Sequence, residues 1–198
     1  SKPVNRGANI RRAGEEIQKD QLALSAGQKL SPAAIGLLAN FGLQTVDVHK
    51  KPVVCCIATG SELKEAGTEL QFGEIYDSNS IMLQSALQEL KLDPAQIVRS
   101  VDDQQALVET LAEALQISDV VIVTGGVSVG RFDYVKDAVE HAGIKEVFWK
   151  VAQKPGKPFY FAADTTRGKY VFGLPGNPAS ALVCFYEYVK PALQKLMG

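Results

Sequence analysis

The segment Asp119-Val120-Val121-Ile122-Val123-Thr124-Gly125-Gly126-Val127-Ser128-Val129-Gly130 joins a continuous apolar run to a glycine-rich loop. A continuous run is typical of a strand that is buried on both faces of a parallel sheet. The loop after it has little side-chain bulk, so its backbone N–H groups can approach an anion closely. The segment therefore predicts an open α/β sheet that binds a phosphate-like or oxyanion ligand beyond the ends of its strands.

Further strands and helices alternate on both sides of this segment. The sequence predicts a three-layer α/β/α domain with a mostly parallel sheet, and hairpin-like spacing near the end allows an antiparallel strand. The expected strands are residues 53–58, 97–101, 119–123, 147–152, 159–162 and 170–172. The helices between them show apolar stripes at helical spacing, as in residues 79–90 and 133–141. We assign residues 51–198 to this domain.

The first fifty residues have a different pattern, with arginines and glycines around single apolar residues. This pattern predicts short strands and turns, so residues 1–50 are expected to be a partial β-rich domain, the end of a domain cut short. Ser31 and Pro32 suit the N-cap and first position of a helix that runs to about Phe41.

Composition excludes several classes of protein. The chain has 198 residues and a formal net charge of −1, which gives no general attraction to nucleic acid or to a membrane surface. No apolar run reaches the roughly 20 residues of a spanning helix, so a cytoplasmic protein is expected. Cys55, Cys56 and Cys184 lack C-x-x-C spacing and fit buried free thiols better than a metal or redox role. The chain has only two histidines, so chemistry would depend on carboxylates and lysines.

The glycine loop contributes Thr124, Gly125, Gly126 and Ser128 as candidate ligand contacts. Its spacing is neither the dinucleotide-binding pattern G-x-G-x-x-G nor the Walker pattern. On spacing alone, an ordinary glycine-rich turn explains the loop as well as an anion cradle does.

Two proline-containing segments, Lys154-Pro155-Gly156-Lys157-Pro158 and Leu174-Pro175-Gly176-Asn177-Pro178, also follow apolar runs. Asn177 and Pro178 suit the start of the last helix, and helix capping alone would explain both. The hydroxyl of Ser180 in the first turn could add a ligand contact.

Three lysines near these loops are candidate anion ligands. Lys150 and Lys154 are expected on one face of a strand, with Cα atoms about 13 Å apart, and Lys157 follows across a turn. Together they would suit a phosphate or a tetrahedral oxyanion, although a solvated strand face explains them as well.

Glu62, Asp102 and Asp133 each occur shortly after a predicted strand. Carboxylates beside phosphate ligands commonly bind Mg²⁺. Taken singly, Asp102 and Asp133 would also serve as helix caps.

Taken in order, several motifs resemble the bacterial molybdopterin molybdenumtransferases, the MoeA family, to which the gephyrin E domain is similar. The resemblance covers essentially the whole chain and includes residues 9–17. Its motifs are Thr59-Gly60-Ser61-Glu62-Leu63, Ile75-Tyr76-Asp77-Ser78-Asn79, residues 124–130 with Asp133-Tyr134, Phe148-Trp149-Lys150, and the two proline-containing segments.

The resemblance implies insertion of molybdate into adenylylated molybdopterin with release of AMP. It implies acidic site residues at Glu62, Asp102 and Asp133, with Mg²⁺ at Asp102 and Asp133. It further implies the pterin phosphate and oxyanion at Lys150 and Lys154, molybdate at Lys157 and Ser180, and loop-shaping roles for Pro175 and Pro178.

Family members resemble four-domain homodimers in which a second subunit completes the active cleft. We therefore expect a truncated product that retains the ligand-binding module and part of the site. Two other functions stay open. One is a molybdopterin adenylyltransferase, which shares the α/β module. The other is a non-catalytic scaffold that binds peptides, as gephyrin does.

Overall fold

The computed structural model describes residues 3–101, 103–125 and 132–198, with Phe132 and Asp133 described by their backbone alone. The chain forms two compact units, residues 1–49 with Gly198 and residues 50–197. None of the helices in the described residues is long and apolar enough to cross a bilayer.

The first unit contains helix α1, Pro32–Asn40, and turns. Ser31 caps α1 as expected, because its side chain accepts a hydrogen bond from the backbone N–H of Ala34. Residues 3–49 contain no strand, so the expected β-rich character is wrong for this stretch. Its backbone groups bond locally in turns, such as Ala8 N–H to the Asn5 carbonyl, and a strand needs a partner strand to satisfy them.

The second unit is built on a six-stranded sheet in the order β4-β1-β5-β8-β7-β6. Neighbours among β4, β1, β5 and β8 pair in parallel, whereas β7 pairs antiparallel with both β8 and β6. The strands are β1 (Val54–Thr59), β4 (Gln96–Ser100), β5 (Val120–Thr124), β6 (Lys145–Trp149), β7 (Tyr160–Asp164) and β8 (Lys169–Leu174). The mostly parallel sheet with an antiparallel hairpin confirms the predicted α/β fold class.

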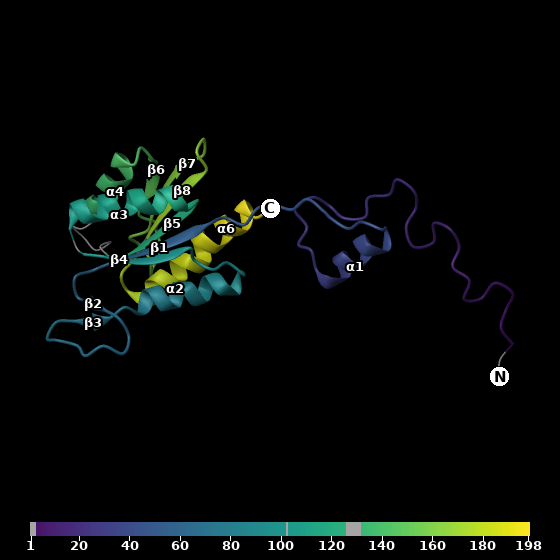
Figure 1. Cartoon of the computed structure of the whole chain (residues 1–198), viewed down its shortest axis with the longest axis horizontal. Helices are drawn as coiled ribbons and strands as arrows, with labels where there is room; N and C mark the ends of the chain where they lie inside the picture. Colours follow the sequence, from purple (N-terminus) through teal and green to yellow (C-terminus); the bar gives the residue numbers. More distant parts are fainter. Residues whose placement is uncertain (1–2, 102, 126–131) are drawn as a thin grey trace. The chain divides into compact units, whose positions relative to one another are not determined.

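Helices cover both faces of this sheet (Figure 1). Helices α3 and α4 lie on one face, and α2 lies with the C-terminal helices on the other. The helices are α2 (Ser78–Glu89), α3 (Gln104–Ile117), α4 (Phe132–His141), α5 (Pro178–Cys184), the π-helical η1 (Phe185–Val189) and α6 (Lys190–Leu196). Strands β2 (Leu63–Lys64) and β3 (Ile75–Tyr76) form a separate parallel ribbon that projects from the main sheet (Figure 1).

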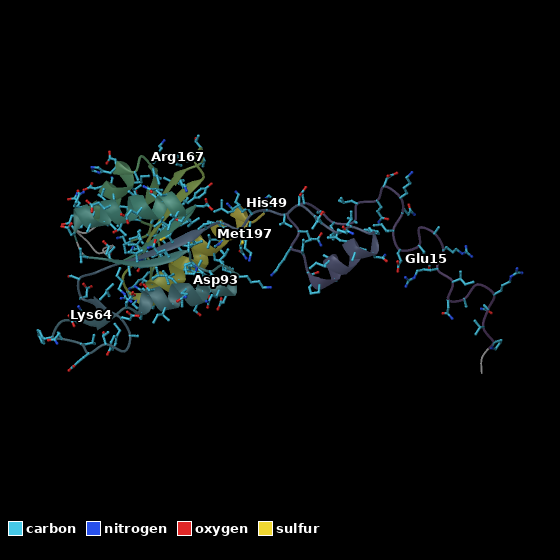
Figure 2. The ribbon with its side chains drawn as sticks, viewed as in Figure 1. Glu15, His49, Lys64, Asp93, Arg167 and Met197 are labelled. Carbon is cyan, nitrogen blue, oxygen red and sulfur yellow. The ribbon has the colours of Figure 1, made fainter. Side chains whose placement is uncertain are left out.

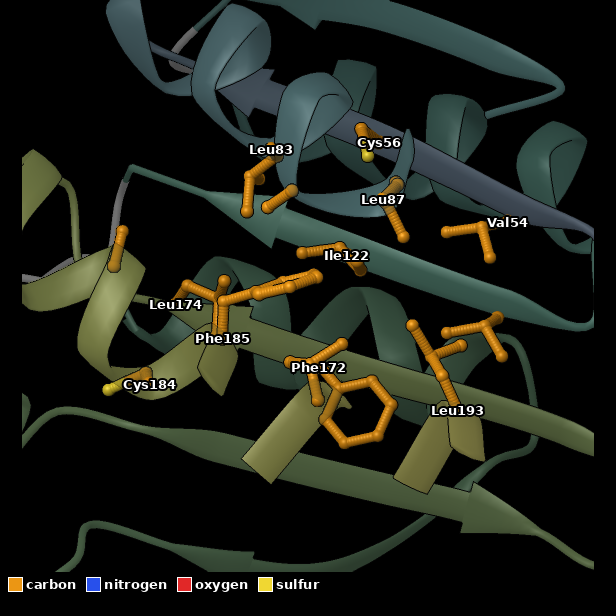
Figure 3. Close-up of a cluster of buried hydrophobic side chains, with 14 of the residues drawn as sticks. Val54, Cys56, Leu83, Leu87, Ile122, Phe172, Leu174, Cys184, Phe185 and Leu193 are labelled. Carbon is orange, nitrogen blue, oxygen red and sulfur yellow. The ribbon is translucent and has the colours of Figure 1, made fainter. Parts of the chain in front are cut away.

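Buried side chains of β1 alternate between the two faces of the sheet, as the pleat of a strand requires. Cys55 and Ile57 join the cluster under α3 and α4. Val54 and Cys56 join the cluster under α2 and α5, where Leu83 packs beside them (Figure 3). Both faces of β1 are therefore buried, which is why its sequence is apolar from Val54 to Ala58.

Candidate functional site

The carboxyl ends of five strands lie along one edge of the main sheet, here called the carboxyl edge. Strands β1, β4, β5 and β8 end there because they run in parallel. Strand β6 also ends there, because two antiparallel pairings relate it to β8. The edge therefore brings together the loops after β5, β6 and β8, which contain the three glycine and proline segments. Ligands of open α/β sheets bind beyond such an edge.

The loops after β1, β5 and β8 approach one another through their backbones. A Cβ atom at Gly125 would lie 2.2 Å from the carbonyl oxygen of Thr59, and Gly125 has a φ of +82°. A Cβ atom at Gly176 would lie 3.4 Å from the Cα atom of Gly125. The hydroxyl of Thr59 donates a hydrogen bond to the Thr124 carbonyl at 3.2 Å. Gly125 is thus required for packing. Gly126 and Ser128 lie outside the described residues.

The segment after β8 begins α5 as the sequence predicts. Asn177 caps the helix, because its Oδ1 accepts hydrogen bonds from the backbone N–H of Ser180 at 3.1 Å and from the Ser180 hydroxyl at 3.3 Å. Pro178 occupies the first turn and is exposed, whereas Pro175 is buried. The Ser180 hydroxyl keeps acceptor capacity beside this cap.

Among the candidate acidic residues, Glu62 is the one whose side chain is described. It is half-buried, and its carboxylate lies against Gly60, where an added Cβ atom would be 2.9 Å from each carboxylate oxygen. Asp102 lies outside the described residues, and the side chain of Asp133 is not described. Within the described part of the chain, no group of three His, Cys, Asp or Glu side chains is placed to bind a metal ion.

The three lysines lie in the connection between β6 and β7, and the expected strand for Lys150 and Lys154 is wrong. Strand β6 ends at Trp149, and Lys150 has a left-handed φ of 67°. Lys154 lies in a turn that contains Pro155 and Gly156, neither of which suits a ladder of strand hydrogen bonds. The spacing estimated for a shared strand face therefore does not apply.

These lysines are nevertheless exposed at the carboxyl edge. Lys150, Lys154 and Lys157 make no ion pair with any residue that the structure describes. The ammonium group of Lys150 lies 3.8 Å from the centroid of the Trp149 ring. Within the described part of the chain, no carboxylate neutralises these three positive charges.

Asp77, Asn79 and Arg99 lie near this edge and were not predicted as site residues. Asp77 is 3% exposed and caps α2, accepting a hydrogen bond from Ser80 N–H at 3.0 Å and one from Arg99 Nε at 3.3 Å. Asn79 Nδ2 donates to the Gly176 carbonyl at 2.9 Å and ties α2 to the loop after β8. An acidic N-cap is visible in the sequence, but these two pairings join segments far apart in the chain.

The cysteines do not supply a nucleophile. All three are free and buried. Burial, with a smaller contribution from Cys55, raises the pKa of Cys56 to about 12, and burial raises the pKa of Cys184 to about 11. Because the reactive form of a cysteine is the thiolate, these thiols are inert near neutral pH.

Comparison with known families identifies the class of domain. Residues 55–195 match the family described as a probable molybdopterin binding domain, and residues 1–42 match the MoeA N-terminal region, domains I and II. A crystal structure titled molybdenum cofactor biosynthesis protein B shares the fold, with a TM-score of 0.54, 18% identity and coverage of 74% of this chain and 94% of its own.

Longer proteins that match this chain show to which family within this class of domain it is similar. The molybdopterin molybdenumtransferase of Haemophilus influenzae is 40% identical over 190 residues, which cover 96% of this chain and 46% of the relative. The enzyme of the same name from Staphylococcus aureus strain Mu50 is 39% identical over 198 residues, covering 100% and 46%. The crystal structure of a molybdopterin biosynthesis MoeA protein from Pyrococcus horikoshii aligns with a TM-score of 0.77 and 34% identity, covering 93% of this chain and 45% of that one. The chain belongs to the MoeA family of molybdopterin molybdenumtransferases, and it spans about half the length of the relatives it matches.

Proposed function

We propose that this chain contributes the ligand-binding module of an enzyme that inserts molybdate into adenylylated molybdopterin. The observation that carries the proposal is the carboxyl edge, where the glycine loops after β1, β5 and β8 pack backbone to backbone and the connection after β6 carries three exposed lysines that make no ion pair with a described residue. In the proposed reaction, water cleaves the phosphoanhydride and AMP leaves. The two dithiolene sulfurs replace one oxygen of molybdate, which leaves as water with the two thiol protons. Molybdenum keeps its oxidation state.

The residues of this edge divide between two anions. We assign Lys150 and Lys154 to the pterin phosphate and its oxyanion, with the loop that contains Thr124 and Gly125 beside them. We assign Lys157 and Ser180 to molybdate, with Pro175 and Pro178 shaping the loop. Lysine acts at such sites as a flexible point charge, and fixed cations lower the energy of transferring phosphoryl groups.

Magnesium fits the donor chemistry of the same edge. Glu62, Asp102 and Asp133 follow β1, β4 and β5 in the sequence, and carboxylate oxygens are ligands that Mg²⁺ prefers. Asp102 and Asp133 would hold the ion, and Glu62 would add negative charge beside it. When bound, Mg²⁺ would neutralise charge on the phosphate oxygens. The proposal also places the protein in the cytoplasm and expects a second subunit to complete the cleft in the full-length enzyme.

Molybdate binding to this chain tests the anion site. Trp149 is the single tryptophan and lies beside Lys150, so its fluorescence can follow the titration. We expect Lys157→Ala to weaken molybdate binding about ten-fold, the loss expected for one charged hydrogen bond. Lys145→Ala at the other end of β6 is the matched control and is expected to bind as wild type does. Equal affinity of wild type and Lys157→Ala would contradict the assignment.

Nucleotide binding tests the metal. Calorimetric titration of adenylylated molybdopterin into the chain should give tighter binding with Mg²⁺ than without it, and Asp133→Ala should remove the difference. Affinity that is the same with and without Mg²⁺ in wild type would count against a metal role.

A further inference from the structure

We propose that Gln153 and Tyr188 are positioning residues that set the conformation of the turn at residues 154–157, and through it the places of Lys154 and Lys157. The role of those lysines rests on the proposed function. The Tyr188 hydroxyl donates a hydrogen bond to Gln153 Oε1 at 2.6 Å. Gln153 Nε2 in turn donates to the Pro155 carbonyl at 2.7 Å. The two side chains thus form a continuous link from η1 to the turn between the lysines.

The connection between β6 and β7 has a base, where residues 150–151 face residues 157–159, and a tip at Pro155 and Gly156. Backbone hydrogen bonds stabilise the base, whereas side chains contact the tip. At the base, Lys150 N–H donates to the Phe159 carbonyl at 2.8 Å and Val151 N–H donates to the Lys157 carbonyl at 3.0 Å. At the tip, the Pro155 carbonyl is bound by Gln153, and the Gly156 carbonyl accepts a contact from Cys184 Sγ at 3.6 Å. Proline has no N–H group, so this tip needs support from outside the backbone ladder.

The turn is seated closely against these supporting side chains. A Cβ atom at Gly156 would lie 2.6 Å from Cys184 Sγ and 2.7 Å from Gln153 Nε2. Gly156 is buried, whereas Lys154 and Lys157 on either side of it are exposed. Gly156 therefore lets the turn pack against Cys184 and Gln153, and the exposed lysines lie before and after it in the chain.

Tyr188 is itself held in place. Its ring packs on Phe159 with the centroids 4.4 Å apart. It lies in η1, a π-helical segment that continues directly from α5, and such segments are frequent at functional sites. Since α5 begins at Pro178, after the N-cap Asn177, and carries Ser180, one continuous helical segment contacts both loops of the proposed molybdate site. This continuity makes η1 the element that fixes the lysine turn relative to the Ser180 turn.

The experiment compares Tyr188→Phe, Gln153→Ala and Gln153→Glu in molybdate titrations followed by Trp149 fluorescence. We expect each to weaken binding about three- to ten-fold, the range for one lost hydrogen bond, while the melting temperature changes little. Gln153→Glu keeps an acceptor for Tyr188 but loses the donor to Pro155, so it should be as weak as Gln153→Ala. The double variant of Tyr188→Phe with Gln153→Ala should be no weaker than Gln153→Ala, because both act through one link.

Tyr186→Phe is the matched control, because the Tyr186 hydroxyl donates to Glu89 Oε2 at 2.7 Å, away from the turn. It should bind molybdate as wild type does. Wild-type affinity in the folded Tyr188→Phe and Gln153→Ala variants, or fully additive losses, would overturn the proposal.

Hydrogen exchange separates this proposal from the proposed function. If wild type binds no molybdate, the proposed function fails, and amide exchange of residues 150–159 then decides the positioning role. Faster exchange in Tyr188→Phe and Gln153→Ala than in Tyr186→Phe supports it, and equal exchange in all three overturns it.

Discussion

At the amino edge of the six-stranded sheet, basic side chains bind the protein's own backbone, whereas the lysines of the carboxyl edge make no ion pair with any described residue. Arg167, which is labelled in Figure 2, lies in the turn between β7 and β8. Its Nη2 donates to the carbonyls of Ala142 and Gly143 at 3.1 and 2.9 Å. Lys169 donates to the Ser118 carbonyl at 2.7 Å. These carbonyls belong to the ends of α4 and α3, where cations are favourable.

The difference separates two uses of positive charge. A cation that satisfies a helix end contributes to the free energy of unfolding and is occupied by the protein itself. A cation that faces water contributes little to stability and can be neutralised by a bound anion. The two edges also differ in how closely the chain packs, because Gly125 and Gly176 at the carboxyl edge contact neighbouring backbone, while an added Cβ atom at Gly168 of the amino edge would have nothing within 4 Å. Each contrast can be tested by substitution.

The largest expected effect comes from adding one methyl group at the carboxyl edge. Gly125→Ala places a Cβ atom 2.2 Å from the Thr59 carbonyl oxygen at a φ of +82°. We expect a loss of about 3 kcal/mol in unfolding free energy, which combines overpacking with an unfavourable left-handed residue. Urea denaturation followed by circular dichroism measures it.

Gly168→Ala provides the control, because Gly168 has a φ of +67° and nothing within 4 Å of an added Cβ atom. Its cost should be about 1 kcal/mol, from the backbone conformation alone. Equal losses in the two variants would mean that the close approach at Gly125 does not matter.

The second prediction compares the removal of one positive charge at each of the two edges. Arg167→Ala should lower the unfolding free energy by about 1.5 kcal/mol, because it removes the hydrogen bonds to Ala142 and Gly143 from a partly exposed side chain. Lys154→Ala should change it by less than about 0.5 kcal/mol, as substitutions of exposed side chains that make no ion pair with a described residue usually do. Denaturation curves of both variants make the measurement. A destabilisation by Lys154→Ala as large as that by Arg167→Ala would remove the distinction between the edges.

Local patterns in the sequence predicted the elements that decide the fold. The apolar runs of β1 and β5 are readable because both faces of these strands are buried, and burial then constrains every residue. The helix starts at Ser31 and Asn177 were predicted because an N-cap bonds a backbone group three residues away. Such signals are local, so a single sequence contains them.

The parts that could not be predicted depend on contacts between distant segments. Strand β6 ends at Trp149 because Lys150 has a left-handed backbone conformation. A lysine gives no sign of this conformation in the sequence. The link between Gln153 and Tyr188 joins positions 35 residues apart. The capping of α2 by Asp77 was not predicted, and the pairing of Asp77 with Arg99 depends on the register of β4 beside β1. The connection that carries the three lysines follows β6 at the carboxyl edge, but the strand expected for Lys150 and Lys154 was wrong.

The third prediction concerns the hydroxyl that ties two strand ends together at the carboxyl edge. Thr59→Val keeps the shape of the side chain and removes the hydrogen bond to the Thr124 carbonyl, so we expect a loss of about 1 kcal/mol in unfolding free energy. Thr110→Val is the control, because the Thr110 hydroxyl bonds a carbonyl within its own helix, that of Ala106. Thermal and urea unfolding should show a smaller loss for Thr110→Val, and the reverse order would contradict a tie between β1 and β5.

The smallest expected effect is a pH dependence at the amino edge. The side-chain hydrogen bond from Arg167, followed by a backbone hydrogen bond from the same residue, lowers the pKa of Asp164 below its ordinary value of 3.8. A carboxyl group with a lowered pKa in the folded state adds stability above its unfolded pKa and loses it as the pH falls through the folded pKa. Wild type should therefore be slightly more stable than Asp164→Asn at neutral pH, and the difference should shrink only below about pH 4. Melting temperatures of both proteins between neutral and strongly acidic pH measure this difference. Because Asp164 is only half-buried and Arg167 is exposed, the difference should also decrease at high salt. In the Arg167→Ala background, Asp164→Asn should have a smaller pH-dependent effect in this range, since the guanidinium is removed while the backbone hydrogen bonds from residues 166 and 167 to Asp164 remain. A difference that persists unchanged in that background would show that the carboxylate acts through its turn and not through Arg167.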